Sequence, residues 1–461
     1  MNANSKEFPA TAPVVHLLTV GDELLAGDIV DSNKARLAAR ARALGLEVRR
    51  AVTVRDRVPE IVAALREAAG EADVCLVSGG LGPTTDDLTT AAVAEAAGRP
   101  LRRDPGAVAR LEEKFRRFGV PMPAANLEQA DFPEGAEILP NPVGSAEGLA
   151  CELPTEATAE PATGRATNRE GRGCIVFVMP GVPVELERML ADEVVPRLRQ
   201  RFALRPVPRR IYRVIGLGES TLAARIEGLL ARARERSPGL QAMYVHYRAH
   251  MPQVTVALEA TPGPDGAQAT EAELASLDAE MSEALGSGLY GIGELELAPR
   301  VVEALVEARL RFATAESCTG GGLGALVTSV SGSSACFRGG IISYDNDVKE
   351  RLLGVPAEML AAHGAVSEPV ARAMAHGARQ RLGSDLAAGI TGIAGPGGGS
   401  PGKPVGTVHI AVADGDETIH RALHLRGDRG TVQAASATWA LKLLWDRLIA
   451  RGVASVAVRD P

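Results

Sequence analysis

Short apolar runs alternate with longer helical patterns at both ends of this chain, and this alternation restricts its fold more than any other feature. In the first third, His16–Val20 and Asp73–Val77 are apolar runs of strand length. Patterns with helical periodicity cover residues 33–44, 60–70 and 86–97. Short strands that alternate with helices predict a parallel sheet covered on both faces. We therefore predict the α/β fold class.

The chain has 461 residues, enough for about three domains at roughly 100–200 residues each. We expect them at residues 1–198, 199–288 and 289–461. The middle domain reads as a small α+β unit, in which an alternating strand at 253–260 lies between helices at 220–236 and 271–285.

Residues 154–173 are rich in Thr, Ala, Pro, Arg and Gly and have no apolar periodicity. Such a composition predicts a loop. Strand patterns flank it on both sides, so we expect an insertion within the first domain whose two flanking strands pair.

Composition and charge narrow the functional classes. The formal net charge is -7 and the sequence pI is about 5.8, whereas nucleic-acid-binding domains usually carry a basic excess. The five cysteines have no zinc-site spacing, which predicts reduced thiols. Residues 1–12 lack the apolar segment of a signal peptide, and no run reaches the roughly 18 apolar residues of a membrane span. We expect a cytoplasmic protein without a membrane partner.

A glycine-rich run, SGGLGPTTDD at residues 78–87, lies between an apolar strand and a predicted helix. Glycines let backbone amides approach an anion, and a helix N-terminus favours phosphate. The two aspartates can cap the helix or hold a divalent cation. Glu23, in the run GDELL after the first strand, would lie at the same carboxyl edge. The candidate phosphate and metal site consists of Glu23, Gly79, Gly80, Gly82, Thr84, Thr85, Asp86 and Asp87, with Asp86 and Asp87 as candidate metal ligands.

The last third contains a second group of motifs: AESCTGG at 315–321, SGSSACF at 331–337, YDNDVK at 344–349 and TGIAGPGGG at 391–399. Amide hydrolysis needs a nucleophile, a base and donors for an oxyanion. No His lies close in sequence to Ser317 or Ser334, so Lys349 is the candidate base if burial lowers its pKa. Ser–Lys pairs are a known variant of the catalytic triad. Both serines stay open as the nucleophile, whereas we expect Cys318 to be a small buried hydrophobe.

The amino-terminal motifs carry a family resemblance. GDELLAGDIVDSN, SGGLGPTTDD, NPVGSAEG and MPGVPVELERM together resemble the amino-terminal half of CinA-type competence/damage-inducible proteins, a molybdopterin-binding fold. The resemblance implies a metal-dependent ADP-ribose pyrophosphatase that forms AMP and ribose 5-phosphate. That chemistry needs a phosphate cradle, a divalent metal ion as cofactor and an activated water. The sequence does not indicate the general base.

The last third resembles the CinA C-terminal domain, the nicotinamide mononucleotide (NMN) amidohydrolase family, because four motifs agree in order and spacing. The resemblance implies conversion of NMN and water to nicotinic acid mononucleotide and ammonia, without a cofactor. It implies Ser334 as nucleophile and Lys349 as base, and it adds Ser317, Tyr344 and Thr391 to the catalytic set. The implied substrate-binding residues are Glu316, Thr319, Gly320, Gly321, Gly392, Gly395 and Arg429, the last facing the substrate phosphate. Asp345 stands where the family motif often has Ser and adds a negative charge.

The middle domain resembles a KH-type fold, and the family resemblance implies a homodimer. The turn GLGES at 216–220 lacks the GXXG spacing with which KH domains grip nucleic acid. We therefore expect packing or solvated roles for the local arginines, which are Arg205, Arg209, Arg210, Arg213 and Arg225. Two other functions stay open: an accessory role in DNA uptake or recombination, with steeply salt-dependent DNA binding, and pterin-cofactor binding by the front half.

Overall fold

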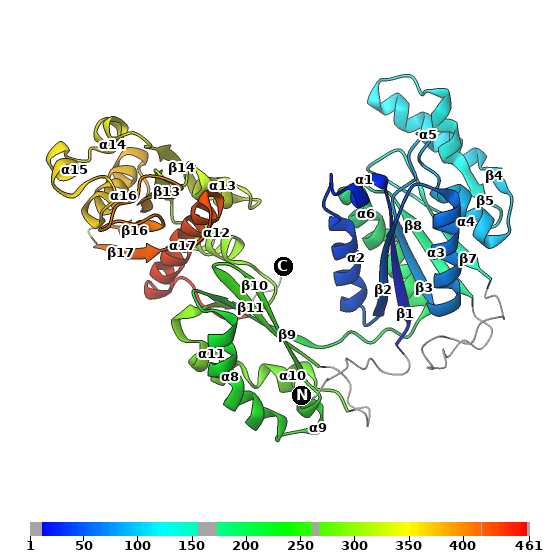
Figure 1. Ribbon diagram of the computed structural model, residues 1–461, viewed down its shortest axis with the longest axis horizontal. Helices are drawn as coiled ribbons and strands as arrows, with labels where there is room; N and C mark the ends of the chain where they lie inside the picture. The colour runs from blue at the N-terminus through cyan, green and yellow to red at the C-terminus, as the bar shows by residue number, and fades with distance from the viewer. Residues whose placement is uncertain (1–11, 155–172, 261–266, 416, 459–461) are drawn as a thin grey trace. The chain divides into compact units, whose positions relative to one another are not determined.

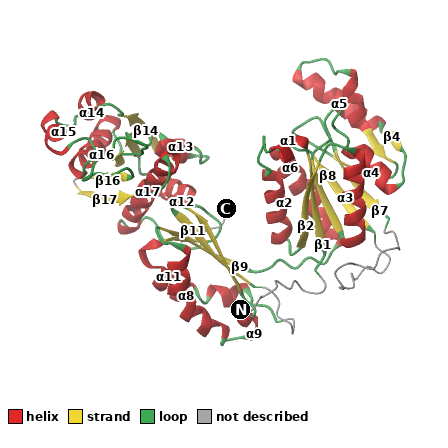
Figure 2. Cartoon of the chain, viewed as in Figure 1, coloured by secondary structure: helices red, strands yellow, loops and turns green. Residues whose placement is uncertain are grey.

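The computed structural model describes residues 12–154, 173–260, 267–415 and 417–458. The chain divides into two compact units between Val207 and Pro208 (Figure 1). Each unit has its own sheets and cores, and the secondary structure of both is drawn in Figure 2. Among the described residues, no helix has the length and apolar character that a membrane crossing requires.

Unit 1 is built on a six-stranded sheet in the order β2-β1-β3-β8-β7-β6. Its strands are β1 (Val14–Val20), β2 (Glu47–Val54), β3 (Val74–Ser78), β6 (Glu137–Leu139), β7 (Gly148–Leu153) and β8 (Cys174–Met179). The first four strands in that order run parallel, and β7 and β6 are antiparallel additions. The predicted pairing of the strands that flank the insertion is confirmed, because β7 pairs with β8. The inserted loop itself lies outside the described residues.

Helices cover both faces of this sheet, as the alternation predicts (Figure 1). Neighbouring residues of β1 alternate between two cores: Leu18 packs in the core with α3 and α4, and Leu17 packs in the core with α2 and α6. The helices are α1 (Asp22–Ala26), α2 (Ser32–Ala43), α3 (Val58–Glu71), α4 (Thr89–Ala97), α5 (Pro105–Phe118), α6 (Pro183–Met189) and α7 (Val195–Arg201). A 3-10 helix η1 (Ala124–Ala130), a π-helical turn η2 (Leu190–Val194) and a small ribbon of β4 (Leu101–Arg103) with β5 (Asp131–Pro133) complete the unit.

Unit 2 begins with a four-stranded antiparallel sheet in the order β10-β11-β9-β12. Its strands are β9 (Arg209–Ile215), β10 (Tyr244–His250), β11 (Gln253–Glu259) and β12 (Leu289–Ile292), and its helices are α8 (Glu219–Arg234), α9 (Pro238–Gln241), α10 (Glu271–Ala275) and α11 (Asp278–Leu285). The expected single helix at 271–285 is therefore two helices. Ser276 ends α10 and its hydroxyl donates to the Glu273 carbonyl oxygen at 2.6 Å, a local bond that competes with helix continuation.

The second sheet of unit 2 has the order β14-β13-β15-β16-β17, and its first three strands run parallel. The strands are β13 (Phe312–Glu316), β14 (Phe337–Ile342), β15 (Leu386–Gly392), β16 (Thr407–Asp414) and β17 (Glu417–His424). Helices α12 (Leu297–Glu307), α13 (Gly322–Thr328) and α17 (Arg429–Ala450) cover one face, and α14 (Asn346–Leu353), α15 (Ala357–His363) and α16 (Glu368–Leu382) cover the other. Short 3-10 helices η3 (Gly286–Gly288) and η4 (Ser333–Ala335) precede β12 and β14.

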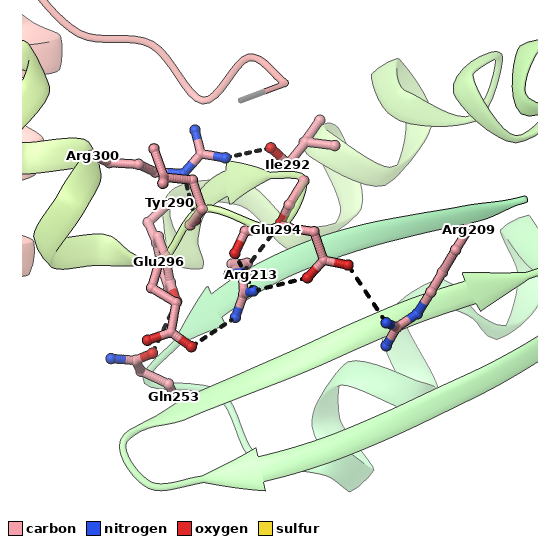
Figure 3. A network of polar contacts seen from close by, with 10 residues as sticks. Arg209, Arg213, Gln253, Tyr290, Ile292, Glu294, Glu296 and Arg300 are labelled. Atoms are coloured by element: carbon pink, nitrogen blue, oxygen red, sulfur yellow. Dashed lines mark hydrogen bonds and ion pairs between the residues drawn. The ribbon is translucent and has the colours of Figure 1, made fainter. Parts of the chain in front are cut away.

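Buried arginines join the middle sheet of unit 2 to α12, a helix that covers the second sheet (Figure 3). Arg300 is fully buried in α12 and donates to the main-chain oxygens of Leu295 at 2.9 Å and Ala457 at 3.0 Å. Arg213 of β9 donates to the Gly293 carbonyl oxygen at 3.2 Å and pairs with Glu296 at 3.3 Å. The expected boundary between residues 288 and 289 therefore differs from the structure, because β12 belongs to the middle sheet and the two regions form one compact unit.

Candidate functional site

The carboxyl edge of the parallel strands β13, β14 and β15 gathers most of the C-terminal motif residues. Ser317 follows β13, and its main-chain N–H donates to the Ile390 carbonyl oxygen of β15 at 3.0 Å. Ser343 follows β14, and its N–H donates to the Glu316 carbonyl oxygen at 2.7 Å. Three strand ends thus meet within hydrogen-bond contact of one another. The edge is where α/β sheets bind ligands.

The buried carboxylate of Glu316 holds the AESCTGG turn in place through hydrogen bonds. The residue is 1% exposed, and its carboxylate accepts hydrogen bonds from the Thr319 hydroxyl at 2.7 Å and from the N–H groups of Leu323 at 2.9 Å and Gly324 at 2.8 Å. A carboxylate at the start of α13 also offsets the positive end of the helix dipole. Glu316 and Thr319 were expected to bind substrate, but their polar groups are bonded to this turn and shape it instead. Gly320 and Gly321 take positive φ angles of 63° and 101° in the same turn, which glycine adopts without strain.

Lys349 reaches this edge from α14. The side chain is 1% exposed, and Nζ donates to the carbonyl oxygens of Ser343 at 2.8 Å and Tyr344 at 3.1 Å. No carboxylate pairs with it in the part of the chain that the structure describes. Burial lowers its pKa, while the nearby negative charge of Asp345 acts in the opposite direction. Lys349 therefore deprotonates more readily than an ordinary lysine.

The Ser334–Lys349 pair expected from the sequence does not form within one chain. Ser334 is exposed in η4, at the amino end of β14, where the Phe312 N–H donates to the Cys336 carbonyl oxygen at 2.8 Å. Lys349 binds at the carboxyl end of the same strand. Six strand residues separate the two ends, which is about 20 Å at roughly 3.3 Å per residue. The sequence motifs indicate which residue types are present, but they do not indicate that β14 separates Ser334 from Lys349.

Ser317 lies instead on the side of the edge where Lys349 is held. The residue is 8% exposed, and its hydroxyl makes no hydrogen bond to another described residue. Lys349 binds Ser343, and Ser343 binds the residue that precedes Ser317. Of the two candidate serines, the structure therefore brings Ser317 and not Ser334 to the lysine-bearing edge.

Arg429 begins α17 and faces the rim of the same edge. Its guanidinium donates to the Gly395 carbonyl oxygen at 2.8 Å and to the Tyr344 hydroxyl oxygen at 2.9 Å. Arg429 and Tyr344 are both exposed, and α17 is 22 residues long, with Asp428 capping its start. An exposed arginine at the start of a helix is a suitable position for a phosphate.

Thr391 and Gly392 end β15, but each has a structural partner. The Thr391 hydroxyl donates to the Ala365 carbonyl oxygen at 2.8 Å and is buried, so it holds the α15–α16 connection rather than facing the site. A Cβ on Gly392 would lie 3.0 Å from the Cys318 sulfur, which shows how closely the AESCTGG turn packs on β15.

Burial raises the pKa of Cys318 to about 12, so its thiol stays protonated near neutral pH and is a poor nucleophile.

Several residues of this site carry no sequence signal. The Ser343 and Tyr344 carbonyl oxygens fix Lys349, and the Gln433 amide donates to the Cys318 carbonyl oxygen at 2.8 Å. Main-chain oxygens are the same in every residue, so only the folded chain identifies these partners. Asp345 caps α14 through the Asp347 N–H at 2.9 Å, which explains its place in the motif.

A second candidate site is a cavity of about 550 Å³ at the carboxyl edge of the unit 1 sheet. Glu23, Gly79, Gly80, Gly82, Asp86 and Asp87 line it, as the sequence predicts. Its other carboxylates are Asp31, Asp56 and Glu185, and the lining contains no Lys, Arg or His. Thr84 and Thr85 are exposed and are not among its lining residues. An anion bound here would need a positive counter-charge that the lining does not supply.

The glycine turn of this cavity differs from the expected helix cap. α4 begins at Thr89 with Leu88 as N-cap, so Asp86 precedes the helix. Asp87 accepts a hydrogen bond from the Thr84 N–H at 2.9 Å and closes the turn. A Cβ on Gly79 would lie 2.4 Å from the Val20 carbonyl oxygen, and its φ is 105°. Only glycine fits there without strain.

The metal ligands expected in this cavity are not assembled as a cage. In the described ranges, no three His, Cys, Asp or Glu side chains lie together in a way that could hold a metal ion. Burial raises the pKa of Asp56, and the charges of Glu23, Asp22 and Asp86 raise it further. These carboxylates therefore repel one another, and Asp56 is a member of the site that the sequence did not indicate.

The chain matches two families over most of its length. Residues 16–200 match the family described as a probable molybdopterin binding domain, and residues 294–448 match the CinA C-terminal domain. A CinA-like protein of Anaeromyxobacter dehalogenans (strain 2CP-C) is 42% identical over 432 residues, which is 93% of this chain and 98% of that protein. A CinA-like protein of Geobacter metallireducens is 43% identical over 435 residues, which is 94% of this chain and 98% of that protein.

Solved structures match parts of the chain. The competence/damage inducible protein CihA from Agrobacterium tumefaciens is 41% identical and covers 33% of this chain and 93% of its own, with a TM-score of 0.33. The protein CinA with unknown function from Thermoplasma acidophilum is 30% identical and covers 41% of this chain and 98% of its own, with a TM-score of 0.33.

The fold and the matches define a class of protein that joins a molybdopterin-binding-like α/β domain to a CinA C-terminal domain. Within that class, the chain belongs to the CinA-like protein family.

Proposed function

We propose that the C-terminal part hydrolyses the carboxamide of NMN to nicotinic acid mononucleotide and ammonia. The observation that carries this proposal is the environment of Lys349: a buried amine, bonded to two carbonyl oxygens and to no described carboxylate, at the strand edge that also bears Ser317. The choice of NMN as substrate rests on the resemblance of four motifs to the NMN amidohydrolase family.

The proposed mechanism uses Ser317 as nucleophile and Lys349 as base. A neutral amine has two hydrogens and one lone pair, and the Ser343 and Tyr344 carbonyl oxygens accept the two hydrogens. The lone pair is then free to take the Ser317 proton while Oγ attacks the carboxamide carbon. Lys349 returns that proton to the nitrogen as the carbon–nitrogen bond breaks and ammonia leaves. Water then hydrolyses the acyl-serine by the same route.

Arg429 and Tyr344 would bind the nucleotide phosphate. Arg429 is exposed, and its guanidinium already donates to the Tyr344 hydroxyl oxygen. A phosphate at the start of α17 would accept hydrogen bonds from both side chains, and the helix dipole would favour it. Arg429→Lys should therefore raise KM for NMN about tenfold with little change in kcat, because a lysine cannot make the two-pronged contact.

The purified chain incubated with NMN should release ammonia. Ser317→Ala and Lys349→Ala should each lower kcat by at least about 100-fold, while Glu350→Gln, an exposed change one residue from Lys349, should leave it unchanged. Full activity in both alanine variants would contradict the assigned residues, and no ammonia from the unaltered chain would contradict the reaction.

For unit 1 we propose metal-dependent hydrolysis of ADP-ribose to AMP and ribose 5-phosphate. The supporting observation is the cavity of about 550 Å³, lined by six carboxylates and no cationic side chain, because a diphosphate could enter it only with a cation. Mg²⁺ needs just one or two carboxylates when phosphates supply other ligands, and those one or two would come from Glu23, Asp56 and Asp86 of the lining. When bound, the ion would neutralise phosphate charge.

This second activity should respond to chelation differently from the first. EDTA should abolish AMP formation. It should leave ammonia release from NMN unchanged, because the proposed amidase mechanism uses side chains of the protein and no metal ion. Asp56→Asn should lower AMP formation more than Asp28→Asn, an exposed change outside the cavity lining. AMP formation that survives EDTA would contradict the proposed role of the ion.

The arginines of β9 in the middle sheet are engaged in ion pairs rather than available for nucleic-acid phosphates. Arg209, Arg210 and Arg213 each pair with a carboxylate of unit 2, which are Glu294, Asp278 and Glu296 respectively. We therefore propose that DNA is not a direct partner. A gel-shift at low salt should show no complex.

A further inference from the structure

The glycine-rich loop between β15 and β16 is hydrogen-bonded at its base and at its tip. At the base, the Ile393 N–H donates to the Thr407 carbonyl oxygen at 2.9 Å, and the Gly406 N–H donates to the Ile393 carbonyl oxygen at 2.7 Å. At the tip, Ser400 and Lys403 exchange main-chain hydrogen bonds of 2.9 and 3.0 Å. The loop is therefore a hairpin with two arms that face each other.

The second arm of this hairpin, residues 403–406, packs on the first arm through Val405. A Cβ on Gly395 would lie 2.6 Å from a methyl carbon of Val405, and a Cβ on Gly399 would lie 2.9 Å from the Val405 nitrogen. Glycine at these two positions lets the arms approach this closely. The Gly395 carbonyl oxygen also accepts the 2.8 Å hydrogen bond from Arg429. The place of the second arm therefore determines where Arg429 is held.

The half-buried side chain of Lys403 binds the second arm to the end of α15. Its Nζ donates to the carbonyl oxygen of His363, the last residue of α15, at 2.7 Å. A lysine can satisfy a helix-terminal carbonyl that has no partner within the helix. Two residues further on, the Ala365 carbonyl oxygen accepts the hydrogen bond from the Thr391 hydroxyl. Both ends of the glycine-rich loop are thus bonded to one short segment, residues 363–365.

We propose that Lys403 is a positioning residue of the amidase site, which holds the second arm so that Arg429 faces the nucleotide phosphate. The amine of Lys403 is bonded to the His363 carbonyl oxygen and does not act on the substrate. Its effect passes through the contact of Val405 with Gly395. The inference rests on the proposed amidase function, in which Arg429 binds the phosphate.

Steady-state kinetics with NMN test this role. Lys403→Met keeps the length of the side chain and removes the donor, so KM should rise about tenfold while kcat stays within about twofold. Lys403→Arg should recover most of the lost affinity, because a guanidinium can still donate to the His363 carbonyl oxygen. Arg381→Met removes an exposed cation in the last turn of α16 and should change neither value.

A double-mutant cycle separates positioning from a general loss of stability. In the Arg429→Ala background, Lys403→Met should change KM by less than about twofold, because the group through which it acts is already gone. Val405→Ala weakens the same contact and should raise KM only when Arg429 is present. Equal tenfold effects of Lys403→Met in both backgrounds, or a lower Tm with an unchanged KM, would overturn the inference.

Amide hydrogen exchange tests the loop without the reaction. In Lys403→Met, the amides of residues 393–406 should exchange at least about threefold faster than in the unaltered chain, while those of α16 keep their rates. Equal exchange of the loop in both chains would contradict the hold of Lys403 on the second arm. If the unaltered chain releases no ammonia, the proposed function fails, and this comparison still decides whether Lys403 holds the loop.

Discussion

The Lys349 amine is held at the strand edge by two carbonyl oxygens and is removed from solvent. Burial disfavours its charged form, which is why its pKa lies below the ordinary lysine value. Burial therefore bears on the chemistry, because a lysine with a lowered pKa gives up its proton more readily and its neutral amine can accept a proton from serine.

The rate of ammonia release should therefore rise with pH. The active form is the neutral amine, so kcat/KM should increase as pH rises through the pKa of Lys349, which lies below the ordinary lysine value. The free energy of unfolding should also decrease as pH falls from the ordinary lysine pKa through the lowered pKa of Lys349. In that interval the folded state binds the proton less readily than the unfolded state. Stopped assays and urea unfolding across pH 7 to 10 would measure both.

Lys349→Arg provides the control for this pH dependence. A guanidinium stays protonated throughout the range, so the variant should be inactive at every pH. Activity of Lys349→Arg with an unchanged pH profile would assign the titration to another group.

Glu316 illustrates a motif residue whose role is structural. Its carboxylate accepts three hydrogen bonds inside the AESCTGG turn. Glu316→Gln keeps the shape but replaces an ionised acceptor with a neutral amide, one half of which cannot accept. The free energy of unfolding of unit 2 should fall by about 1–3 kcal/mol, as measured by urea unfolding, whereas the exposed Glu350→Gln should change it by less than about 0.5 kcal/mol.

At the scale of elements, a glycine-to-alanine substitution should have opposite effects on stability in α8 and in α16. In α8, a Cβ on Gly228 would meet only the far end of Arg232, at 3.7 Å. In α16, a Cβ on Gly377 would lie 2.1 Å from the Leu353 carbonyl oxygen at the end of α14. The first position tolerates a side chain, and the second is where two helices approach too closely for one.

Gly228→Ala should therefore raise the free energy of unfolding by about 0.5–1 kcal/mol, because alanine is the better helix former. Gly377→Ala should lower it by about 1–3 kcal/mol or more, because α14 must move away. Thermal unfolding of the two variants beside the unaltered chain would compare them. Equal effects of the same sign would show that helix propensity, not the α14–α16 contact, governs both positions.

At the scale of the whole molecule, the chain consists of two compact units with separate cores. Buried arginines link the middle sheet to α12, which packs on the C-terminal sheet, so the two sheets should unfold together. Scanning calorimetry should show two transitions, of which nicotinic acid mononucleotide raises the Tm of only the one belonging to unit 2, because a ligand stabilises the unit that binds it. A single transition that shifts as a whole would contradict independent units.

Local signals in the sequence predicted much of this protein. Apolar runs and helical periodicity predicted β1, β3, α2, α3 and the sheet covered on both faces, since burial on one or two faces leaves a fixed period in the chain. Glycine-rich turns after strands marked both candidate sites, because ligands bind where strands end. The types of residue at those sites were also readable, since they follow from the motifs.

The positions of those residues relative to one another needed the tertiary structure. The parallel register of β13 and β14 separates Ser334 from Lys349 and brings Ser317 to the lysine-bearing edge. Burial lowers the pKa of Lys349, main-chain oxygens hold its amine in place, and Asp56 joins the unit 1 cavity from a distant segment. A motif specifies which groups are present, but distance and burial depend on strand pairing between residues far apart in the chain, and local sequence does not encode that pairing.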